Sequence, residues 1–458
     1  MKKYKLITIF IYIAILLLPL VAFNFEEGAI SESENRVLAD NPFKDGINGE
    51  TITSFKHYFD DRIGFRDEMI DAYTNINDKL FDKLVHPFYT KGKDGHIFAG
   101  GMSVEIEYNE YHDAFINMIV EIQQYCERHG IEFLFVFNPA KPAVYQEYIL
   151  DSVNYDRSWV DTFFEKLDDT DVNYIDLTSV LIEKKNEGYD VFNKKFDANH
   201  WNSTGAYFGI NAVLEELSKT NNVKPNTMDQ YEETHTVADK LLLSSYRIDE
   251  EIIKYEPKNL NLIDLTDLYK DDLRIHYNYN EFGEYINQDI KDEFKLLSFQ
   301  GSYVNTYGKP HLKVGIQDYV HVHNYYNVLH LPYYAQIFKP DAIIFEVAEY
   351  TIYDSYFKYK DMLEINYNDL LENVIINTDK IDYKNVEDLD LTITKGKSIT
   401  EVIINGQDYD NAWIKLPNTT YDFEKIDGLN VSGVCNEDFV DNDFEIYILK
   451  DNNLIAYK

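Results

Sequence analysis

The pattern of apolar and polar residues along this chain changes in kind several times, and its first block is an apolar N-terminus. Lys2, Lys3 and Lys5 precede an uncharged run over residues 6–23, which at 18 residues is at the short end of what crosses a bilayer as a helix. Lysines on the short side favour a cytoplasmic N-terminus, and residues 20–23 make a poor signal-peptide cleavage site. We therefore predict a single-pass cell-membrane anchor over residues 1–24 with the bulk of the chain extracytoplasmic; a cleaved signal peptide is the alternative.

The middle of the chain has the pattern of an α/β protein. Polar, turn-rich residues 25–50 predict a tether, and the folded domain is expected over residues 51–380. A helical pattern ends at Gly130, and helix-length segments separate the apolar runs that follow. Nearly continuous apolar runs, typical of parallel strands covered on both faces, occupy residues 131–137, 172–177, 294–299, 319–323 and 341–347. The alternation predicts a doubly wound parallel sheet, whose sites gather at the carboxyl ends of the strands.

Two regions depart from this alternation. Residues 221–292 are acidic and contain tyrosines, which indicates an insertion or a long crossover rather than a separate domain. Past about residue 381 the apolar period becomes two, as in residues 389–393 and 445–457. We expect a small β-rich domain over residues 381–458.

Composition narrows the classes of function. At 458 residues the chain exceeds what one core usually supports, and 80 acidic against 43 basic residues give a net charge of −37. That charge would repel nucleic acid, so a nucleic-acid partner is excluded. No cluster has metal-ligand spacing and no glycine-rich phosphate loop occurs, so neither metal nor cofactor is expected. Cys126 and Cys435 lie far apart, and the sequence leaves open whether they pair.

The segment from Phe196 to Asn202 looks most like an active site. Asp197 stands three residues before His200, and Asn202 reads as the N-cap of a following helix. A helix N-terminus disfavours a protonated imidazole, whereas a carboxylate on one ring nitrogen fixes the tautomer and stabilises the imidazolium. The pair is therefore either a general base with its orienting acid or a buried contact that pins a loop.

A candidate nucleophile follows the third predicted strand. Gly301 would permit a tight turn after residues 294–299, and Ser302 would then stand at a helix start, where backbone N–H groups can stabilise an oxyanion. His200 and Ser302 are 102 positions apart in the sequence, which is no objection to a triad, because triad members meet through the fold.

Several ordered segments resemble the DHHW family, relatives of the alginate O-acetyltransferase catalytic proteins. The likeness covers roughly residues 34–355. It is carried by Glu34-Asn35-Arg36, residues 58–66, Asp94-Gly95-His96-Ile97-Phe98, Pro139-Ala140-Lys141 with Tyr145, Asp197 to Trp201, Phe299-Gln300-Gly301-Ser302-Tyr303, and Lys339-Pro340-Asp341 leading to Glu346 and Glu349-Tyr350. The resemblance implies an SGNH-hydrolase-like α/β fold.

The resemblance also implies roles. Ser302 would be the nucleophile, His200 the base and Asp197 its orienter, in O-acyl transfer, most simply O-acetylation, of a cell-surface polysaccharide. An integral membrane acyltransferase would be the partner that supplies the acyl group. Candidate substrate-binding side chains are Tyr145, Trp201, Tyr303, His323 and Glu349.

Two departures from the family pattern keep other functions open. The family usually places one residue between aspartate and histidine, whereas Ala198 and Asn199 both intervene here, as in ordinary SGNH esterases. The family's Gly-Asp-Ser is Gly-Ser here. The alternatives are a polysaccharide esterase using the same site and a non-catalytic polysaccharide-binding or assembly protein with a degenerate site.

Overall fold

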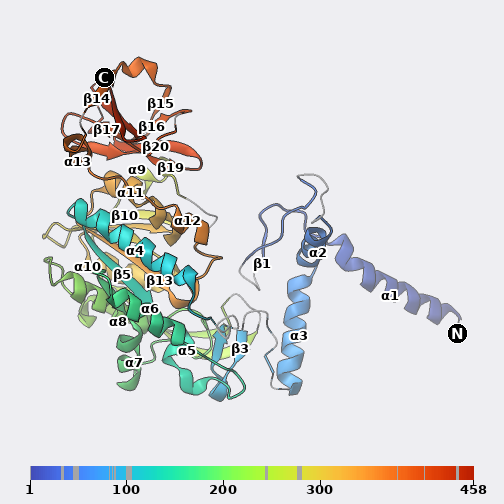
Figure 1. Ribbon diagram of the computed structural model, residues 1–458. Helices are drawn as coiled ribbons and strands as arrows, with labels where there is room; N and C mark the ends of the chain where they lie inside the picture. The colour runs from blue at the N-terminus through green and yellow to red at the C-terminus, as the bar shows by residue number, and fades with distance from the viewer. Residues whose placement is uncertain are drawn as a thin grey trace.

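The computed structural model describes most of the chain (Figure 1). The described residues are 2–31, 36–44, 51–81, 83–84, 86, 89–99, 106–242, 246–275, 281–378, 380–406, 408–439 and 443–458. Glu34 and Asn35, from the first segment of the family resemblance, lie outside these ranges.

An apolar helix, α1 (Lys2–Val21), stands apart from the folded body at the N-terminus (Figure 1). Its stretch Tyr4–Val21 is 18 residues long and is not buried against the rest of the protein. By length and composition alone it is sufficient to cross a membrane, and a signal sequence passes the same test.

The tether is fastened to the helices that follow it. Arg62 is 2% exposed; its Nε donates to the Ala39 carbonyl at 2.7 Å and its Nη1 to the Glu26 carbonyl at 2.5 Å. This arginine therefore has a structural role. The elements here are β1 (Ile30–Ser31), β2 (Arg36–Val37), α2 (Thr51–Arg62), α3 (Arg66–Phe81), β3 (Tyr89–Lys91) and β4 (Ile97–Ala99).

A seven-stranded sheet in the order β6-β5-β13-β11-β12-β10-β9 forms the centre of the molecule. The strands are β5 (Glu132–Asn138), β6 (Tyr174–Asp176), β9 (Leu262–Asp264), β10 (Glu281–Asn287), β11 (Lys295–Phe299), β12 (Asp318–His323) and β13 (Ala342–Ala348). From β6 to β12 in this order all neighbours pair in parallel. The carboxyl ends of these strands therefore meet at one edge.

Helices cover both faces of the sheet (Figure 1). Phe115 of α4 shares a core with Phe135 of β5, whereas Ile210 of α8 shares another with Leu134, the adjacent residue of the same strand. Successive strand residues point to opposite faces, so both faces are packed, and the predicted doubly wound fold is confirmed. The helices are α4 (Glu110–Arg128), α5 (Lys141–Val144), α6 (Ser158–Asp168), α7 (Thr178–Asn186), α8 (Ser203–Leu217), α10 (Lys309–Gly315) and α11 (Leu331–Phe338).

The acidic stretch 221–292 does more than interrupt the alternation. It forms a hairpin of β7 (Tyr231–Lys240) and β8 (Arg247–Pro257), the short helix α9 (Thr266–Tyr269), and two strands, β9 and β10, that extend the sheet in antiparallel fashion. The apolar pattern does not reveal β10 because Glu284, 1% exposed, points into the structure and pairs with Lys295 at 3.0 Å.

The C-terminal region consists of two β-sheets packed on a common core. A five-stranded sheet contains β17 with Ile414, and a four-stranded sheet contains β16 with Val402; both side chains belong to that core. The pairs are antiparallel except β14 with β22. The strands are β14 (Ile381–Lys384), β15 (Leu391–Lys395), β16 (Ile399–Ile404), β17 (Asn411–Lys415), β18 (Thr420–Asp422), β19 (Glu424–Ile426), β20 (Leu429–Cys435), β21 (Glu445–Lys450) and β22 (Asn453–Tyr457).

The connection between the two regions joins the β-sheets before residue 381. Asn368 Nδ2 donates to the Ala412 carbonyl at 3.0 Å, and Leu371 of α13 (Leu371–Ile376) packs with Trp413. The preceding helix is α12 (Tyr359–Leu363). Cys126 and Cys435 are both buried free thiols.

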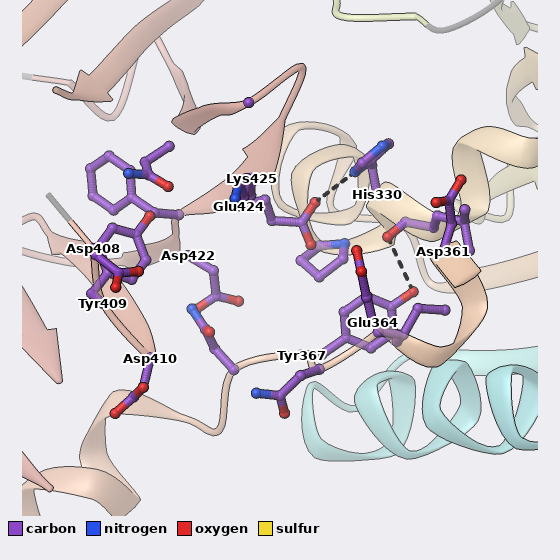
Figure 2. A pocket seen from close by; sticks show the side chains of 18 of the residues that line it. His330, Asp361, Glu364, Tyr367, Asp408, Tyr409, Asp410, Asp422, Glu424 and Lys425 are labelled. Carbon is purple, nitrogen blue, oxygen red and sulfur yellow. Dashed lines mark hydrogen bonds and ion pairs between the residues drawn. The ribbon is translucent and has the colours of Figure 1, made fainter. Parts of the chain in front are cut away.

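A polar cavity of about 850 Å³ lies where the α/β region meets the β-sheets (Figure 2). Asp361 and Glu364 line it from one side and Asp422 and Glu424 from the other. His330 Nδ1 stands 3.7 Å from Glu424 Oε2 across the junction. The cavity is therefore a carboxylate-rich seam between the two regions.

Candidate active site

The predicted acid–base segment forms a loop that ends at the start of α8. Phe192 and Trp201 close the loop as an isolated antiparallel bridge. Asn202 caps the helix, since its side chain accepts the Gly205 N–H at 2.9 Å and its Nδ2 donates to the Asp190 carbonyl at 2.7 Å. The predicted N-cap is confirmed, and His200 lies in the turn that enters the helix.

Trp201 wedges this loop against the helix. Its side chain is fully buried, and a Cβ on Gly209 would come within 2.3 Å of the indole. The indole N–H donates to the Tyr303 carbonyl at 2.9 Å. Trp201 thus joins the loop that carries His200 to the residue after Ser302.

Ser302 follows the end of β11 and begins a helical segment that passes through a π-helical turn, Val304–Gly308, into α10. Gly301 does not adopt the left-handed backbone that a tight glycine turn would need. The reason for glycine is steric, because a Cβ there would lie 3.1 Å from the Tyr325 ring and 3.2 Å from Glu346 Oε2. This corrects the expectation that Gly301 supplies conformational freedom.

The fold brings Asp197, His200 and Ser302 into one hydrogen-bonded row. His200 Nε2 lies 2.9 Å from Ser302 Oγ, and His200 Nδ1 lies 2.9 Å from Asp197 Oδ2. Both distances are those of ordinary hydrogen bonds, with the imidazole between hydroxyl and carboxylate. The arrangement can deprotonate the serine hydroxyl and hold the resulting imidazolium.

Asp197 is kept ionised although it is 1% exposed. Burial alone would raise its pKa, but the His200 imidazole and the backbone N–H groups of Asn199 and His200, each 3.1 Å from Oδ1, bring the pKa below its ordinary value. These contacts also show how the longer spacing is accommodated: the extra residue forms a turn around the carboxylate.

Three of the predicted substrate-binding side chains are buried packing residues. Trp201 and Tyr303 are fully buried and Tyr145 is 4% exposed. The Tyr303 hydroxyl donates to the Asn199 carbonyl at 2.7 Å, and the Tyr145 hydroxyl accepts the Val191 N–H at 3.3 Å. The surroundings of these aromatic rings therefore argue against contact with a sugar.

Glu349 and His323 lie at the same edge of the sheet as Ser302, with partners of their own. Glu349 is 6% exposed, pairs with Arg157 Nε at 3.1 Å and accepts the Ala140 N–H at 3.0 Å. His323 Nδ1 lies 2.7 Å from the Gln300 carbonyl, next to the nucleophile turn. Substrate contact by either residue stays a prediction.

The structure adds two side chains that the sequence did not assign. Asn199 Nδ2 donates to the Tyr350 hydroxyl at 2.8 Å, and Tyr350 also lies near Ser302. The Tyr350 ring lies 6.4 Å from that of Tyr356, which is 44% exposed. These tyrosines lead from Ser302 to the surface. Asn199 and Tyr350 both lie in segments that carry the family resemblance, Asp197 to Trp201 and Glu349-Tyr350, but no role was predicted for either residue.

Within the described ranges, no group of three or more His, Cys, Asp or Glu side chains is arranged to hold a metal ion.

Part of the chain that contains this site is similar in sequence to a known protein family. Residues 90–259 match the sequence profile of the SGNH hydrolase-like domain of the acetyltransferase AlgX. Over these residues the chain is similar to an SGNH hydrolase-like acetyltransferase domain. The family resemblance predicted from the sequence is confirmed. The AlgX match contains Asp197 and His200 and ends before Ser302.

Several solved structures are similar to part of this chain. Bacillus cereus PatB1 is 18% identical with a TM-score of 0.46, over 59% of this chain and 99% of that chain. The O-acetyltransferase domain of Pseudomonas putida AlgJ is 14% identical with a TM-score of 0.42, over 61% of this chain and 99% of that chain. A DHHW family protein from Eubacterium siraeum is 12% identical with a TM-score of 0.41, over 62% and 100%. No curated protein matches the sequence.

Proposed function

We propose that this protein is a membrane-anchored, extracytoplasmic O-acyltransferase that transfers an acyl group, most simply acetyl, to a hydroxyl of a cell-surface polysaccharide. The observation that carries the proposal is the 2.9 Å contact between His200 Nε2 and Ser302 Oγ, with Asp197 on the other ring nitrogen. The AlgX-type domain match supports the acyl-transfer class.

In the first half of the proposed reaction, Ser302 Oγ attacks the carbonyl carbon of an acyl ester while its proton passes to His200 Nε2. The carbonyl electron pair forms an oxyanion facing the Ser302 N–H, which at the first helical position has no intrahelical acceptor. The oxyanion collapses, the donor alkoxide leaves, and His200 returns the proton to it. The product is an acyl-Ser302 ester.

In the second half, a sugar hydroxyl gives its proton to His200 Nε2 and attacks the same carbonyl carbon. Collapse of this intermediate forms the sugar ester and breaks the bond to Ser302 Oγ, which takes the proton back. Asp197 stabilises the imidazolium in both halves.

Covalent labelling of the full-length chain in detergent tests the proposal. Wild type should react with a fluorophosphonate probe and turn over an acetyl ester, whereas Ser302→Ala should lose labelling and His200→Ala should lose at least about 10³-fold in rate. Ser218→Ala, at the C-terminal end of α8, is the control and should behave as wild type. Unchanged ester turnover and surface acetylation in Ser302→Ala and His200→Ala would disprove the proposal.

Hydrolysis at the same site is the second candidate, favoured by the Asp-x-x-His spacing. Product analysis with and without an oligosaccharide acceptor separates the two. Acyl transfer predicts labelled ester on the sugar, and an esterase predicts only free acid. No labelling of wild type under any condition would favour a non-catalytic polysaccharide-binding protein.

Membrane attachment belongs to the same proposal. We expect α1 to remain uncleaved, with Lys2, Lys3 and Lys5 in the cytoplasm. An integral membrane acyltransferase would then be the partner that delivers the acyl group. The N-terminal residue of protein extracted from membranes should then be Met1 or Lys2. A mature N-terminus near Phe23 would show that the helix is a removed signal sequence.

A further inference from the structure

A second carboxyl group lies beneath the nucleophile turn and is not used by the reaction above. Glu346, near the carboxyl end of β13, is fully buried. Its Oε2 accepts the Gly301 N–H at 2.6 Å, and its Oε1 accepts a hydrogen bond from Asn138 Nδ2 at 2.5 Å. The backbone of the residue before Ser302 and the last side chain of β5 thus converge on one carboxyl group.

We propose that Glu346 is a positioning residue for Ser302, holding the Gly301 N–H so that the serine hydroxyl reaches His200, and that this hold depends on whether the carboxyl is ionised. The inference rests on the proposed function, since it concerns the same serine. Nothing in the family resemblance assigned Glu346 more than a place in the sequence.

The strand register and the lack of a side chain on Gly301 fix the position of the Glu346 carboxyl. β13 pairs with β11 and places Phe345 opposite Phe299, the last residue of the strand that precedes Ser302. Glu346 is the next residue along β13, so it lies one position beyond the end of that strand. The absence of a Cβ on Gly301 allows the approach, because one would lie 3.2 Å from Glu346 Oε2. Occupation by Glu346 also removes the Gly301 N–H as an oxyanion donor, which leaves that task to the Ser302 N–H.

The environment allows Glu346 to hold or release a proton near neutrality. Burial raises its pKa to about 7, against the hydrogen bonds from Gly301 and Asn138 and the nearby His200. Asn138 Oδ1 is buried without a hydrogen-bond partner among the described residues. It can accept a hydrogen bond from the O–H of protonated Glu346 after rotation of the amide.

The other titratable groups that face Glu346 are few. His200 stands on the loop before α8. Tyr303, Tyr319 and Tyr325, from the nucleophile segment, β12 and the turn after β12, are near enough to interact electrostatically with the carboxyl. Burial raises the pKa of each phenol well above 10, so these tyrosines stay neutral. Ionised Glu346 therefore adds a negative charge that favours the His200 imidazolium.

The test is the pH dependence of fluorophosphonate labelling of the full-length chain. Wild type should show an ionisation near pH 7 that increases the rate, which we assign to Glu346. Glu346→Gln should lose it and label about 10-fold more slowly at pH 8, the factor expected for roughly one pKa unit of lost charge stabilisation. Glu284→Gln, which changes a buried carboxyl at the opposite end of the sheet, is the matched control and should keep the wild-type profile.

Each outcome has a distinct meaning. A Glu346→Gln profile and rate equal to wild type would overturn the inference while leaving the triad proposal intact; no labelling of wild type would instead sink the triad. If the glutamine variant does not fold, Glu346→Asp decides. The shorter side chain should keep an ionisation but label slowly because it does not reach the Gly301 N–H, and a wild-type rate would overturn the inference.

Discussion

At the residue scale, the proposed mechanism is tested most directly by removing the negative charge of Asp197. Asp197→Asn keeps the shape of the side chain but removes the negative charge that faces His200 Nδ1 at 2.9 Å. We expect acyl-enzyme formation to fall by about 10²–10⁴-fold with little change in thermal stability. Burst kinetics with an acetyl ester measure this effect.

Tyr307→Phe is the matched control, since it removes only the 3.3 Å hydrogen bond from the Tyr307 hydroxyl to Asp197 Oδ2. A loss of less than about 10-fold is expected there. Equal burst rates in wild type and Asp197→Asn would mean that His200 acts without an orienting carboxylate.

Lys141 presents a different residue-scale property, a fully buried amine. Its Nζ donates to the carbonyls of Ile97 at 2.6 Å and Lys194 at 3.0 Å, and so ties β4 to the segment just before Asp197. Burial lowers its pKa to about 7. The unfolded chain, with a pKa near about 10.4, binds more protons over the interval between these values.

Stability should therefore rise with pH from about 7 to about 10, by up to roughly 1.4 kcal/mol per pH unit, and this slope should vanish in Lys141→Met. Urea denaturation across that range measures the slope. Lys219→Met, whose parent side chain is 66% exposed, should retain the wild-type slope. A slope unchanged in Lys141→Met would contradict the prediction.

At the element scale, α8 is the support of the catalytic loop, and its first turn depends on Asn202. Removing both of its side-chain hydrogen bonds in Asn202→Ala should cost about 1–2 kcal/mol of stability. Labelling of Ser302 should also slow, because His200 lies two residues before the cap. Chemical denaturation and probe kinetics check the two effects, with exposed Asn222→Ala as control. Equal stability of Asn202→Ala and wild type would show that the loop is held without the cap.

Elements also show where sequence reasoning succeeded and where it stopped. Long apolar runs such as β5 and β13 were found because parallel strands bury both faces. β10 was missed because Glu284 is buried in an ion pair, and a buried charge has no apolar signature. Asp197, His200 and Ser302 were predicted from chemical type and placement, and the fold brings these three side chains together. The burial of Trp201 and Tyr145 was not predicted, because it depends on neighbours that are distant in sequence.

At the scale of the whole molecule, we expect the junction between the two regions to be sensitive to pH, because Asp422 lines the cavity in Figure 2. Burial, followed by the neighbouring charge of Glu424, raises the pKa of Asp422 to about 8. Because the folded state holds this proton more tightly than the unfolded chain, its contribution favours folding at low pH and is lost as pH rises through about 8.

Asp422→Asn should consequently raise stability at pH 8 by about 1–3 kcal/mol and flatten its dependence between pH 5.5 and 8. Thermal denaturation of the full-length chain at the two pH values is the measurement. Exposed Asp388→Asn should match wild type at both. A pH dependence preserved in Asp422→Asn would locate the titrating group elsewhere.

The wedge formed by Trp201 has a practical consequence for finding the natural substrate. The loop of His200 and the segment of Ser302 are joined through the indole and the Tyr303 carbonyl, independently of the bond between base and nucleophile. Ser302→Ala should therefore keep its site assembled while being unable to turn over what it holds. Such a variant can serve as bait: glycan fragments retained by it, and not by a Trp201→Ala variant, would be candidates for the acceptor.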